Sequence, residues 1–239
     1  MAKAELMQKH LAYTLGEYYS KLSEGQREKF SIYYEELLSA SKYMNLTTIL
    51  SEKDVANKHF ADSVYPDIAG LFENEDRVVD IGSGAGFPGI PLKIVRPDLN
   101  VTMIEATGKK AEFIKNVSSK CGLDVSVVSK RAEDIAIEKE YREKYDVCVS
   151  RAVARLDILL ELCAGFVKTN GYIFAYKGDK AAEEKRIAES AAVTLGLEYI
   201  NTHHIIEEDF ERCILVYKKI KPLSDEYPRR YANIKKKPL

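Results

Sequence analysis

The fold is decided by one stretch, Val78-Val79-Asp80-Ile81-Gly82-Ser83-Gly84-Ala85-Gly86-Phe87-Pro88-Gly89. An apolar run of strand type leads straight into closely spaced glycines. Glycine is needed at such a turn because the backbone bends sharply and a ligand must approach where a Cβ would collide. Proline suits the first position of the helix that follows. The stretch therefore predicts a strand, a ligand-binding turn and a helix in direct succession.

Further along the chain, short β-rich runs alternate with helical segments, which is the pattern of βαβ units around a parallel sheet. Strands are expected over 77–81, 101–105, 125–130, 146–150 and 171–177, and helices over 88–94, 109–121, 156–168 and 180–195, with a short turn near 134. Only about five residues separate two last runs, 197–206 and 212–220. That distance is too short for a parallel crossover, so the runs should form an antiparallel hairpin. We therefore expect an α/β fold with a doubly wound, Rossmann-like sheet and a terminal antiparallel strand.

The 239 residues should divide into one large domain and two smaller segments. Residues 1–64 are predicted to form an N-terminal helical extension, because aromatic and apolar side chains such as Phe30 and Tyr33 recur at the spacing of one helix face. Residues 65–220 should form the catalytic domain. Residues 221–239 should form a basic C-terminal tail.

The tail region carries most of the charge asymmetry of the chain. From residue 218 onward eight basic residues face two acidic ones, a local net charge of +6, although the whole chain has a formal net charge of -1. Such a segment suits the phosphates of a nucleic acid. A solvated, disordered tail is the competing interpretation.

Composition indicates a soluble globular protein, with 46% hydrophobic and 31% charged residues. Residues 1–10 lack the apolar core of a signal peptide, and no stretch approaches the ~20 apolar residues of a membrane span. We expect a cytoplasmic monomer without a membrane partner. No metal is expected, because the four cysteines form no C-x-x-C pair and should be small core residues: Cys121, Cys148, Cys163 and Cys213.

Two carboxylates favour S-adenosylmethionine over a dinucleotide, whose binding pattern the glycines alone also fit. Asp80 lies two residues before Gly82, and a negative charge at the mouth of the loop would repel a pyrophosphate but suit an ammonium and a sulfonium. Glu105 closes the next strand, where a carboxylate can accept both ribose hydroxyls. We predict S-adenosylmethionine as the cofactor, bound by Asp80, Gly82, Gly84, Gly86 and Glu105.

The loop after the third strand adds two candidates. In methyltransferases of this architecture that loop lies against the adenine of the cofactor, where a backbone amide and a polar side chain reach the edge of the ring. Ala132 and Glu133 occupy these positions. Asp134, next to them, can equally be explained as a helix N-cap.

Three cations at the ends of the fourth and fifth strands indicate the substrate. Arg151 and Arg155 follow the fourth strand and Lys177 ends the fifth, so all three should face one crevice. They could hold the cofactor carboxylate, an RNA phosphate or the O6 and N7 edge of guanine. A surface ion pair is the alternative explanation for Arg151 or Lys177. We predict catalytic roles for Arg151 and Lys177 and RNA contacts for Arg155 and Lys177.

The end of the fourth strand lacks the motifs of several methyl acceptors. Enzymes that methylate exocyclic amino groups usually place Asn or Asp before Pro-Pro and an aromatic residue there, and cytosine C5 methylation requires an attacking thiolate. The segment Ser150-Arg151-Ala152-Val153 offers neither, and Cys148 lies inside the strand. An acceptor that needs no general base, such as guanine N7, is consistent with this segment.

Over nearly its whole length the chain resembles one family, the bacterial ribosomal RNA small-subunit methyltransferase G family, formerly called glucose-inhibited division protein B. The resemblance rests on Asn45-Leu46-Thr47, Lys58-His59-Phe60-Ala61-Asp62-Ser63, the loop 80–91, Arg151-Ala152-Val153-Ala154, Lys177-Gly178 and Tyr227-Pro228-Arg229-Arg230. One departure follows these motifs, because Tyr231-Ala232-Asn233 stands where the family commonly has a glycine-containing turn. That departure puts the geometry of the tail in doubt, but not the activity.

The resemblance implies S-adenosylmethionine-dependent methylation of guanine N7 in 16S ribosomal RNA of the small subunit. It implies that the cofactor is bound by Gly82, Phe87, Ala132, Glu133 and Arg151. It further implies a pocket rim and an RNA-contacting surface made of Asn45, His59, Asp62, Ser63, Arg229 and Arg230, among which His59 is interpreted as structural. Two alternatives stay open: a NAD-type oxidoreductase on the same loop, against which Asp80 argues, and a non-catalytic RNA-binding module.

Overall fold

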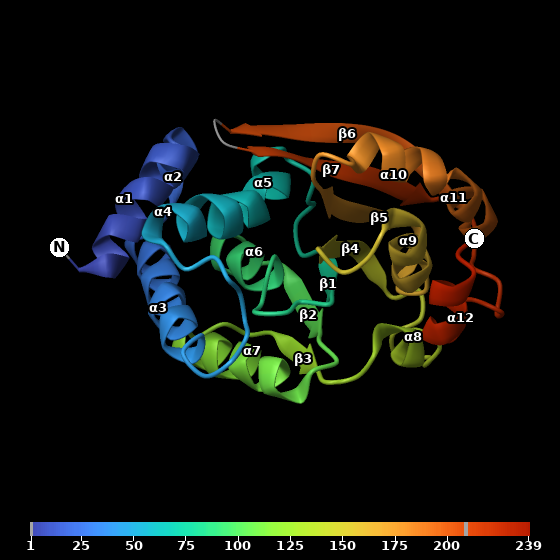
Figure 1. Ribbon diagram of the computed structural model, residues 1–239, viewed down its shortest axis with the longest axis horizontal. Coiled ribbons are helices and arrows are strands. Elements are labelled where there is room, and N and C mark those ends of the chain that lie inside the picture. The colour runs from blue at the N-terminus through green and yellow to red at the C-terminus, as the bar shows by residue number, and fades with distance from the viewer. Residues whose placement is uncertain (1, 208–209) are drawn as a thin grey trace.

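The computed structural model describes residues 2–207 and 210–239, and within them seven strands form one sheet in the order β3-β2-β1-β4-β5-β7-β6 (Figure 1). The first five strands are parallel, and β7 pairs antiparallel with both β5 and β6. The expected α/β fold with a terminal antiparallel strand is therefore confirmed. The strands are β1 (Arg77–Ile81), β2 (Asn100–Ile104), β3 (Ser126–Val128), β4 (Tyr145–Arg151), β5 (Val167–Lys177), β6 (Leu197–Glu207) and β7 (Phe210–Lys219).

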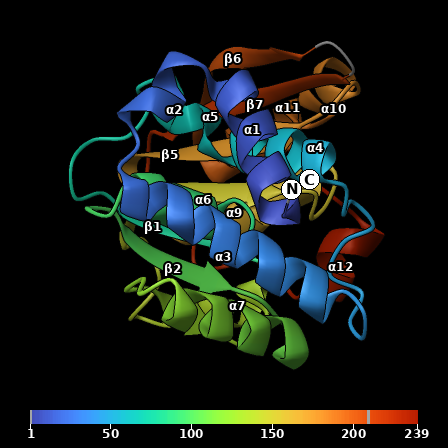
Figure 2. The same ribbon diagram turned by 90° about the vertical axis from the view of Figure 1, so that its left-hand side faces the viewer.

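Helices cover both faces of the sheet, because side chains of the central strands alternate between two apolar clusters. Val78 belongs to one cluster and Val79 to the other. The first face is covered by α1 (Lys3–Leu15), α2 (Glu17–Lys21), α3 (Glu24–Ala40), α4 (Glu52–Asp54), the π-helix η1 (Val55–Ala61), α5 (Asp62–Ile68), α6 (Gly89–Val95) and α7 (Gly108–Lys120) (Figure 2). The second is covered by α8 (Ala132–Ile135), α9 (Leu156–Ala164), α10 (Ala181–Ile187), α11 (Glu189–Leu195) and α12 (Tyr231–Lys236).

The N-terminal helices share an apolar cluster with the sheet rather than forming a core of their own. Met7, Phe30 and Tyr33 are fully buried and belong to the same cluster as Val78 in β1. The helix α3 begins at a capping box, in which Ser23 and Gln26 exchange side-chain and backbone hydrogen bonds. Among the described residues, no helix is long and apolar enough to cross a lipid bilayer. The division of the chain at residues 64 and 220 stays a prediction.

Two predicted helices are shorter or less continuous than the sequence pattern indicated. The helix expected over 156–168 ends at Ala164, and the chain turns at Gly165, where a Cβ would lie 2.9 Å from the Cβ of Ala136. The helix expected over 180–195 is broken at Ala188, where φ is -82° and ψ is 3°. Apolar periodicity continues across both points, so the pattern alone could not locate these ends.

Irregular backbone separates other observed elements from the predicted ones. Residues 41–51, expected to be helical, form a non-helical connection between α3 and α4. Strand β5 starts before the predicted residue 171, and a bulge lies where Asn170 takes a φ of 71°. The antiparallel hairpin between β6 and β7 is confirmed. The connection between its strands is shorter than expected, because β6 ends at Glu207 and β7 begins at Phe210. Residues 208–209 lie outside the described residues.

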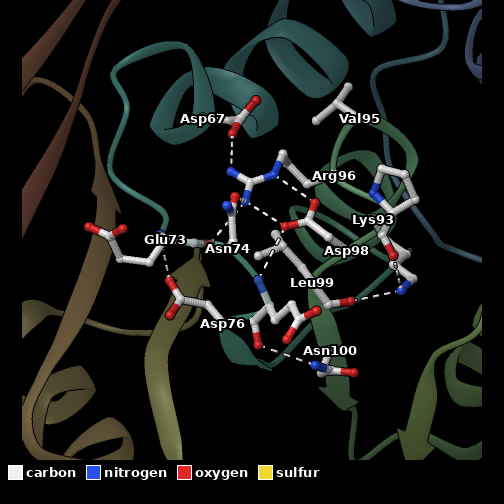
Figure 3. A network of polar contacts seen from close by, with 12 residues as sticks. Asp67, Glu73, Asn74, Asp76, Lys93, Val95, Arg96, Asp98, Leu99 and Asn100 are labelled. Atoms are coloured by element: carbon white, nitrogen blue, oxygen red, sulfur yellow. Dashed lines mark hydrogen bonds and ion pairs between the residues drawn. The ribbon is translucent and has the colours of Figure 1, made fainter.

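A dense polar network joins the segments at the amino end of the parallel strands (Figure 3). The Arg96 guanidinium donates to Asp67 of α5 at 2.8 Å, to both oxygens of Asp98 at 2.8 and 2.6 Å and to the carbonyl of Glu73 at 3.0 Å. The second Asp67 oxygen accepts from the Tyr18 hydroxyl at 2.6 Å. The network therefore fixes α5, the chain before β1 and the chain after α6 to one another.

Candidate functional site

The glycine loop turns between β1 and α6, at the carboxyl end of the parallel strands. The backbone N–H groups of Gly82 and Ser83 both donate to the carbonyl of Ile104 at the end of β2, at 2.9 and 3.2 Å. Gly82 has a φ of +69°, and a Cβ there would lie 2.4 Å from Cγ2 of Val153. Gly86 has a φ of +100°. Any side chain at Gly82 would therefore be strained and would force the loop or Val153 to shift.

Glu105 lies directly after β2 and holds the loop from the side. Its Oε2 accepts a hydrogen bond from the N–H of Gly84 at 2.9 Å, and its Oε1 accepts one from the N–H of Thr107 at 2.7 Å. The side chain is only 7% exposed. A carboxylate has about four lone-pair sites, so each oxygen retains capacity for a ligand hydroxyl. This position suits the ribose contact predicted from the sequence, which stays a prediction.

Asp80 lies beneath the loop, and its expected position at the mouth of the loop is wrong. The side chain is fully buried, Oδ2 accepts from the N–H of Gly89 at 3.0 Å, and Oδ1 has no hydrogen-bond partner among the described residues. Burial raises the pKa of Asp80 to about 7, although the hydrogen bond from Gly89 acts in the opposite direction. The alternation of β1 turns this carboxylate under the loop, so it supports the loop from below.

A cavity of about 130 Å³ opens beside the loop, between the carboxyl ends of β1, β2 and β4. Three predicted cofactor residues, Gly82, Ala132 and Glu133, come together there from different segments. The cavity is lined by Ile81, Gly82, Ile104, Ala106, Lys130, Arg131, Ala132, Glu133, Val153, Leu162 and Tyr231. Its apolar walls with a few polar groups at the rim are typical of a site for a flat organic ring.

Arg151 ends β4 and is fixed by the segment that precedes β1. Its guanidinium donates to the Asp62 carboxylate at 2.7 Å and to the carbonyl of Lys58 at 3.0 Å, and lies 3.2 Å from Nδ1 of His59. It also lies over the ring of Phe87, 4.9 Å from the centroid. Two predicted cofactor residues from separate motifs, Phe87 and Arg151, are thereby in direct contact.

His59 is a neutral packing residue, which agrees with its structural interpretation. Its ring stacks on Phe87 with centroids 4.4 Å apart, and Nε2 lies 3.0 Å from Oγ1 of Thr47. Burial and, to a smaller extent, the positive charge of Arg151 lower the pKa of His59 to about 3. Because a guanidinium only donates, Nδ1 must accept from Arg151 and Nε2 must carry the proton.

The π-helix η1 positions the groups that bind Arg151. This segment carries Lys58 and His59, and Asp62 follows immediately at the start of α5. The Ser63 hydroxyl donates to the carbonyl of His59 at 2.5 Å, and the Ser63 carbonyl accepts from the Tyr176 hydroxyl at 2.8 Å. Short π-helical turns inside helices occur frequently at functional sites. The turn brings the Lys58 carbonyl and the Asp62 carboxylate to the same guanidinium.

Lys177 and Arg155 are engaged in internal contacts. The ammonium of Lys177 donates to the Ala154 carbonyl and to Glu184, both at 2.7 Å, and the side chain is buried. Arg155 forms two hydrogen bonds with Asp157. The structure therefore does not bring Lys177 or Arg155 to the Arg151 network, and their roles in catalysis and RNA contact stay predictions. Lys177 fixes the segment that follows β4.

The remaining RNA candidates belong to two segments, the connection after α3 and the C-terminal tail. Asn45 and Arg230 are exposed. Arg229 pairs with the fully buried Glu161, and the tail beyond it forms the helix α12. The interpretation of the tail as disordered is therefore wrong, because this ion pair and the fully buried Ile234 fasten it to α9. RNA contact by these residues stays a prediction.

Sequence reasoning missed several residues that complete the site. The Tyr33 hydroxyl donates to the carbonyl of Ala85 in the glycine loop at 2.6 Å, and Thr47 fixes the ring of His59. Tyr231 lines the cavity from the far end of the chain. Tyr33 stood in an aromatic helix face and Thr47 in a quoted motif, but neither pattern indicates a partner. Contacts between segments this far apart leave no signal in one sequence.

These features define the class of protein. A doubly wound sheet with an antiparallel β7, a glycine loop after β1 and a carboxylate after β2 make this a Rossmann-like methyltransferase domain. A family model described as rRNA small subunit methyltransferase G, or GidB, matches residues 26–214. The chain belongs to this family, which confirms the resemblance inferred from its motifs and removes the NAD-type alternative.

Relatives and solved structures agree with this assignment. The chain is 39% identical to the ribosomal RNA small subunit methyltransferase G of Lactobacillus johnsonii, covering 94% of this chain and 96% of that protein. It is 42% identical to the protein of the same name from Brevibacillus brevis, covering 91% of this chain and 93% of the relative. TYW2 of M. jannaschii, solved in complex with AdoMet, has a TM-score of 0.51 at 18% identity, covering 65% of this chain and 75% of its own. The YcgJ protein of Bacillus subtilis has a TM-score of 0.53 at 12% identity, covering 68% of this chain and 100% of its own. The two solved structures share the fold.

Proposed function

We propose that this protein transfers a methyl group from S-adenosylmethionine to N7 of a guanine in 16S ribosomal RNA. One observation carries the cofactor assignment: Gly82, Ala132 and Glu133 line a single cavity beside Glu105, at the carboxyl ends of neighbouring strands. Ligands of open α/β sheets bind at that edge. The RNA acceptor is supported by membership of the family.

The residues present fit the cofactor. At Gly82 a Cβ would lie 2.4 Å from Cγ2 of Val153, so glycine lets the loop pack closely against the segment after β4, and both residues line the cavity. Glu105 can accept hydrogen bonds from the ribose, and the buried Glu133 lies at the edge of the cavity, where it can receive the exocyclic amine of adenine. Phe87 and Arg151 would bound the end of the site nearest the methyl group and the carboxylate of the cofactor.

The chemistry requires orientation rather than proton transfer. When bound, S-adenosylmethionine supplies an electrophilic methyl group on a sulfonium. Guanine N7 presents an in-plane lone pair, so the attack needs no general base, and a neutral His59 with both ring nitrogens engaged agrees with that. Within the described residues, Arg151 uses three of its five N–H groups on Lys58, Asp62 and His59, which fixes its plane. The remaining N–H groups can orient a carboxylate or a phosphate.

A methyl-transfer assay tests the proposal. The protein would be incubated with labelled S-adenosylmethionine and small-subunit RNA, both naked and as assembled particles, from a strain that lacks the activity. Label at one N7-methylguanine, located by aniline-sensitive cleavage, is the expected result. The Glu105→Ala variant should lose cofactor affinity, while Glu112→Ala, on an exposed position of α7, should behave as the unaltered protein.

Each outcome of this assay separates one part of the proposal from another. Cofactor binding without transfer to either substrate would overturn the RNA acceptor and leave the cofactor assignment standing. Absence of cofactor binding would overturn the methyltransferase activity itself. Label at a position other than guanine N7 would keep the enzyme class and change the acceptor atom.

The setting of the reaction follows from the same proposal. We infer that the protein acts as a monomer in the cytoplasm, where small ribosomal subunits are assembled. Residues 1–64 would extend the substrate surface with the Asn45 connection, and residues 221–239 would add exposed cations such as Lys235 and Lys236. The affinity of both segments for RNA is expected to fall as the salt concentration rises, because contacts to phosphates release counterions.

A further inference from the structure

The C-terminal tail is attached to the domain by a dedicated arginine. The guanidinium of Arg142, in the loop before β4, donates to the carbonyls of Leu223, Ser224 and Tyr227 at 3.0, 3.1 and 2.9 Å. Because the Arg142 guanidinium is planar and rigid, its hydrogen bonds to three carbonyls fix the path of the chain over residues 223–227. The tail therefore leaves β7 along a defined path rather than as a free arm.

A second, buried attachment sets the position of the helix α12. Both oxygens of Glu161, on α9, accept from Arg229 at 2.8 and 2.5 Å, and Oε1 also accepts the backbone N–H of Arg229 at 2.9 Å. Glu161 is fully buried, as is Ile234 on α12. A buried carboxylate needs such a complete set of partners, because an unpaired charge there would be strongly destabilising. The helix is consequently docked on α9, close to α8 (Figure 1).

This docking places Tyr231 in the wall of the cavity described above. Tyr231 is the first residue of α12, it is half-buried, and it lines the cavity together with Gly82, Glu133 and Leu162. The guanidinium of Arg131 lies 5.8 Å from the centroid of the tyrosine ring. The ring of Tyr231 and the glycine loop therefore line the same cavity.

We propose that Tyr231 is a positioning residue that covers the adenine ring of bound S-adenosylmethionine. The inference rests on the proposed function and adds to it a contact from the C-terminal tail. Aromatic side chains stack on bases of any sequence because each base has a π-face, and such a contact contributes ~1–3 kcal/mol when measured by alanine substitution. The tail then has a part in cofactor binding in addition to its exposed cations.

The cofactor affinity of three variants tests the proposal. Dissociation constants for S-adenosylmethionine would be measured by calorimetry for the unaltered protein, Tyr231→Ala, Tyr231→Phe and the control Tyr13→Ala, whose ring is 84% exposed on α1 at the opposite side of the molecule. Tyr231→Ala should weaken binding by ~5- to 150-fold, the conversion of the stacking energy at 1.4 kcal/mol per tenfold. Tyr231→Phe and Tyr13→Ala should leave the affinity within about twofold.

A fluorescence reporter distinguishes contact from a remote structural effect. The chain contains no tryptophan, so Tyr231→Trp would provide a single indole at the cavity. Titration with S-adenosylmethionine should quench or shift its emission with the same dissociation constant as calorimetry. The matched control Tyr13→Trp should show no change. A saturable signal at position 231 alone supports direct contact with the ligand.

Kinetics separate cofactor contact from RNA contact. In Tyr231→Ala the KM for S-adenosylmethionine should rise while the KM for RNA stays unchanged. A rise in the RNA KM alone would overturn the inference and assign the ring to the nucleic acid. Unchanged cofactor affinity in Tyr231→Ala, with normal binding by the unaltered protein, would overturn the role of Tyr231 but not the proposed function. Failure of the unaltered protein to bind the cofactor would overturn both.

Discussion

The two ends of the parallel strands each carry an arginine held by carboxylates, and the two networks differ in how completely their oxygens are hydrogen-bonded. At the amino end, Arg96 is held by Asp67 and Asp98, and both oxygens of each carboxylate have partners. At the carboxyl end, Arg151 is held by Asp62 and by His59, but Oδ1 of Asp62 has no hydrogen-bond partner among the described residues. One network is complete within the protein, and the other is not.

The two ends of the sheet therefore differ in how completely their buried carboxylates are hydrogen-bonded. Buried polar atoms are nearly always hydrogen-bonded, so an orphaned carboxylate oxygen calls for an explanation. Two lie at the carboxyl end, on Asp62 and Asp80, near a glycine with φ of +69° and a cavity. The polar groups around Arg96 at the amino end are satisfied within the protein, whereas the carboxyl end retains two buried carboxylate oxygens without a hydrogen-bond partner among the described residues.

The largest expected effect is that of Gly82→Ala. The new Cβ would lie 2.4 Å from the Val153 side chain at a φ of +69°, so the loop or Val153, which both line the cavity, must shift. We expect cofactor affinity to fall by about 100-fold, equivalent to ~3 kcal/mol. The control Gly122→Ala has a similar φ of +57° and nothing within 4 Å, and should cost ~1 kcal/mol of unfolding free energy with unchanged affinity. Equal loss of affinity in both variants would contradict the assignment of the two ends.

The two arginines provide a matched pair of substitutions. Arg151→Lys keeps the charge but loses the planar contacts to Lys58, Asp62 and His59, so we expect kcat/KM for methyl transfer to fall by about tenfold to thirtyfold. Arg96→Lys should lower the unfolding free energy by ~1–2 kcal/mol and leave kcat/KM unchanged. Methyl-transfer kinetics and urea unfolding check both expectations. The comparison fails if Arg96→Lys reduces kcat/KM as strongly as Arg151→Lys.

A pH series should show the orphaned carboxylate at Asp80. Burial raises its pKa to about 7 in the folded protein, from an ordinary value of 3.8, so between these two pH values the folded state binds a proton that the unfolded state has lost. Stability from this group is therefore present at low pH and is lost as pH rises towards 7. Relative to Asp80→Asn, the unfolding free energy of the unaltered protein should fall by up to ~1.4 kcal/mol per pH unit between about pH 5 and pH 7. A flat difference would show that the carboxyl is ionised throughout.

The smallest effect is expected at the amino end, from Asp98→Asn. The Arg96 guanidinium lowers the pKa of Asp98 to about 2, so the stabilising ion pair is present above pH ~4 and is lost as pH falls towards 2. The substitution should cost ~0.5–1 kcal/mol at neutral pH, because the pair is partly exposed to solvent. Its pH dependence should run opposite to that of Asp80, and methyl transfer should be unaffected. Acid-range unfolding curves of the two variants check the opposite signs.

Local patterns in the sequence predicted the parts of the structure that depend on nearby residues. Strand β1, the glycine turn and α6 were predicted together because a buried run, positive-φ glycines and a following helix all lie within a short segment. The hairpin of β6 and β7 followed from the length of its connection. The convergence of Gly82 and Glu133 on one cavity also followed, because the carboxyl ends of parallel strands share an edge.

Partners far apart in the chain could not be predicted in this way. The sequence predicts that Lys177 faces the crevice, but its ammonium pairs with Glu184. This pair depends on how β5 and α10 pack, which the sequence pattern does not give. Arg229 was expected on RNA, yet Glu161 lies 68 residues away in the chain and gives no sign of the pair. Asp80 was placed at the mouth of the loop because a charge pattern does not state which side of a strand a residue faces.

The π-helix η1 makes the number of residues between α4 and α5 a structural constraint in its own right. An α-helix advances by ~100° per residue, so deletion of a single residue from the segment would rotate everything on one side of it relative to the other. The Lys58 carbonyl and the Asp62 carboxylate could then no longer face Arg151 together. Among natural variants, insertions and deletions within residues 55–61 should therefore be much rarer than replacements of its two partly exposed residues, Asn57 and Lys58.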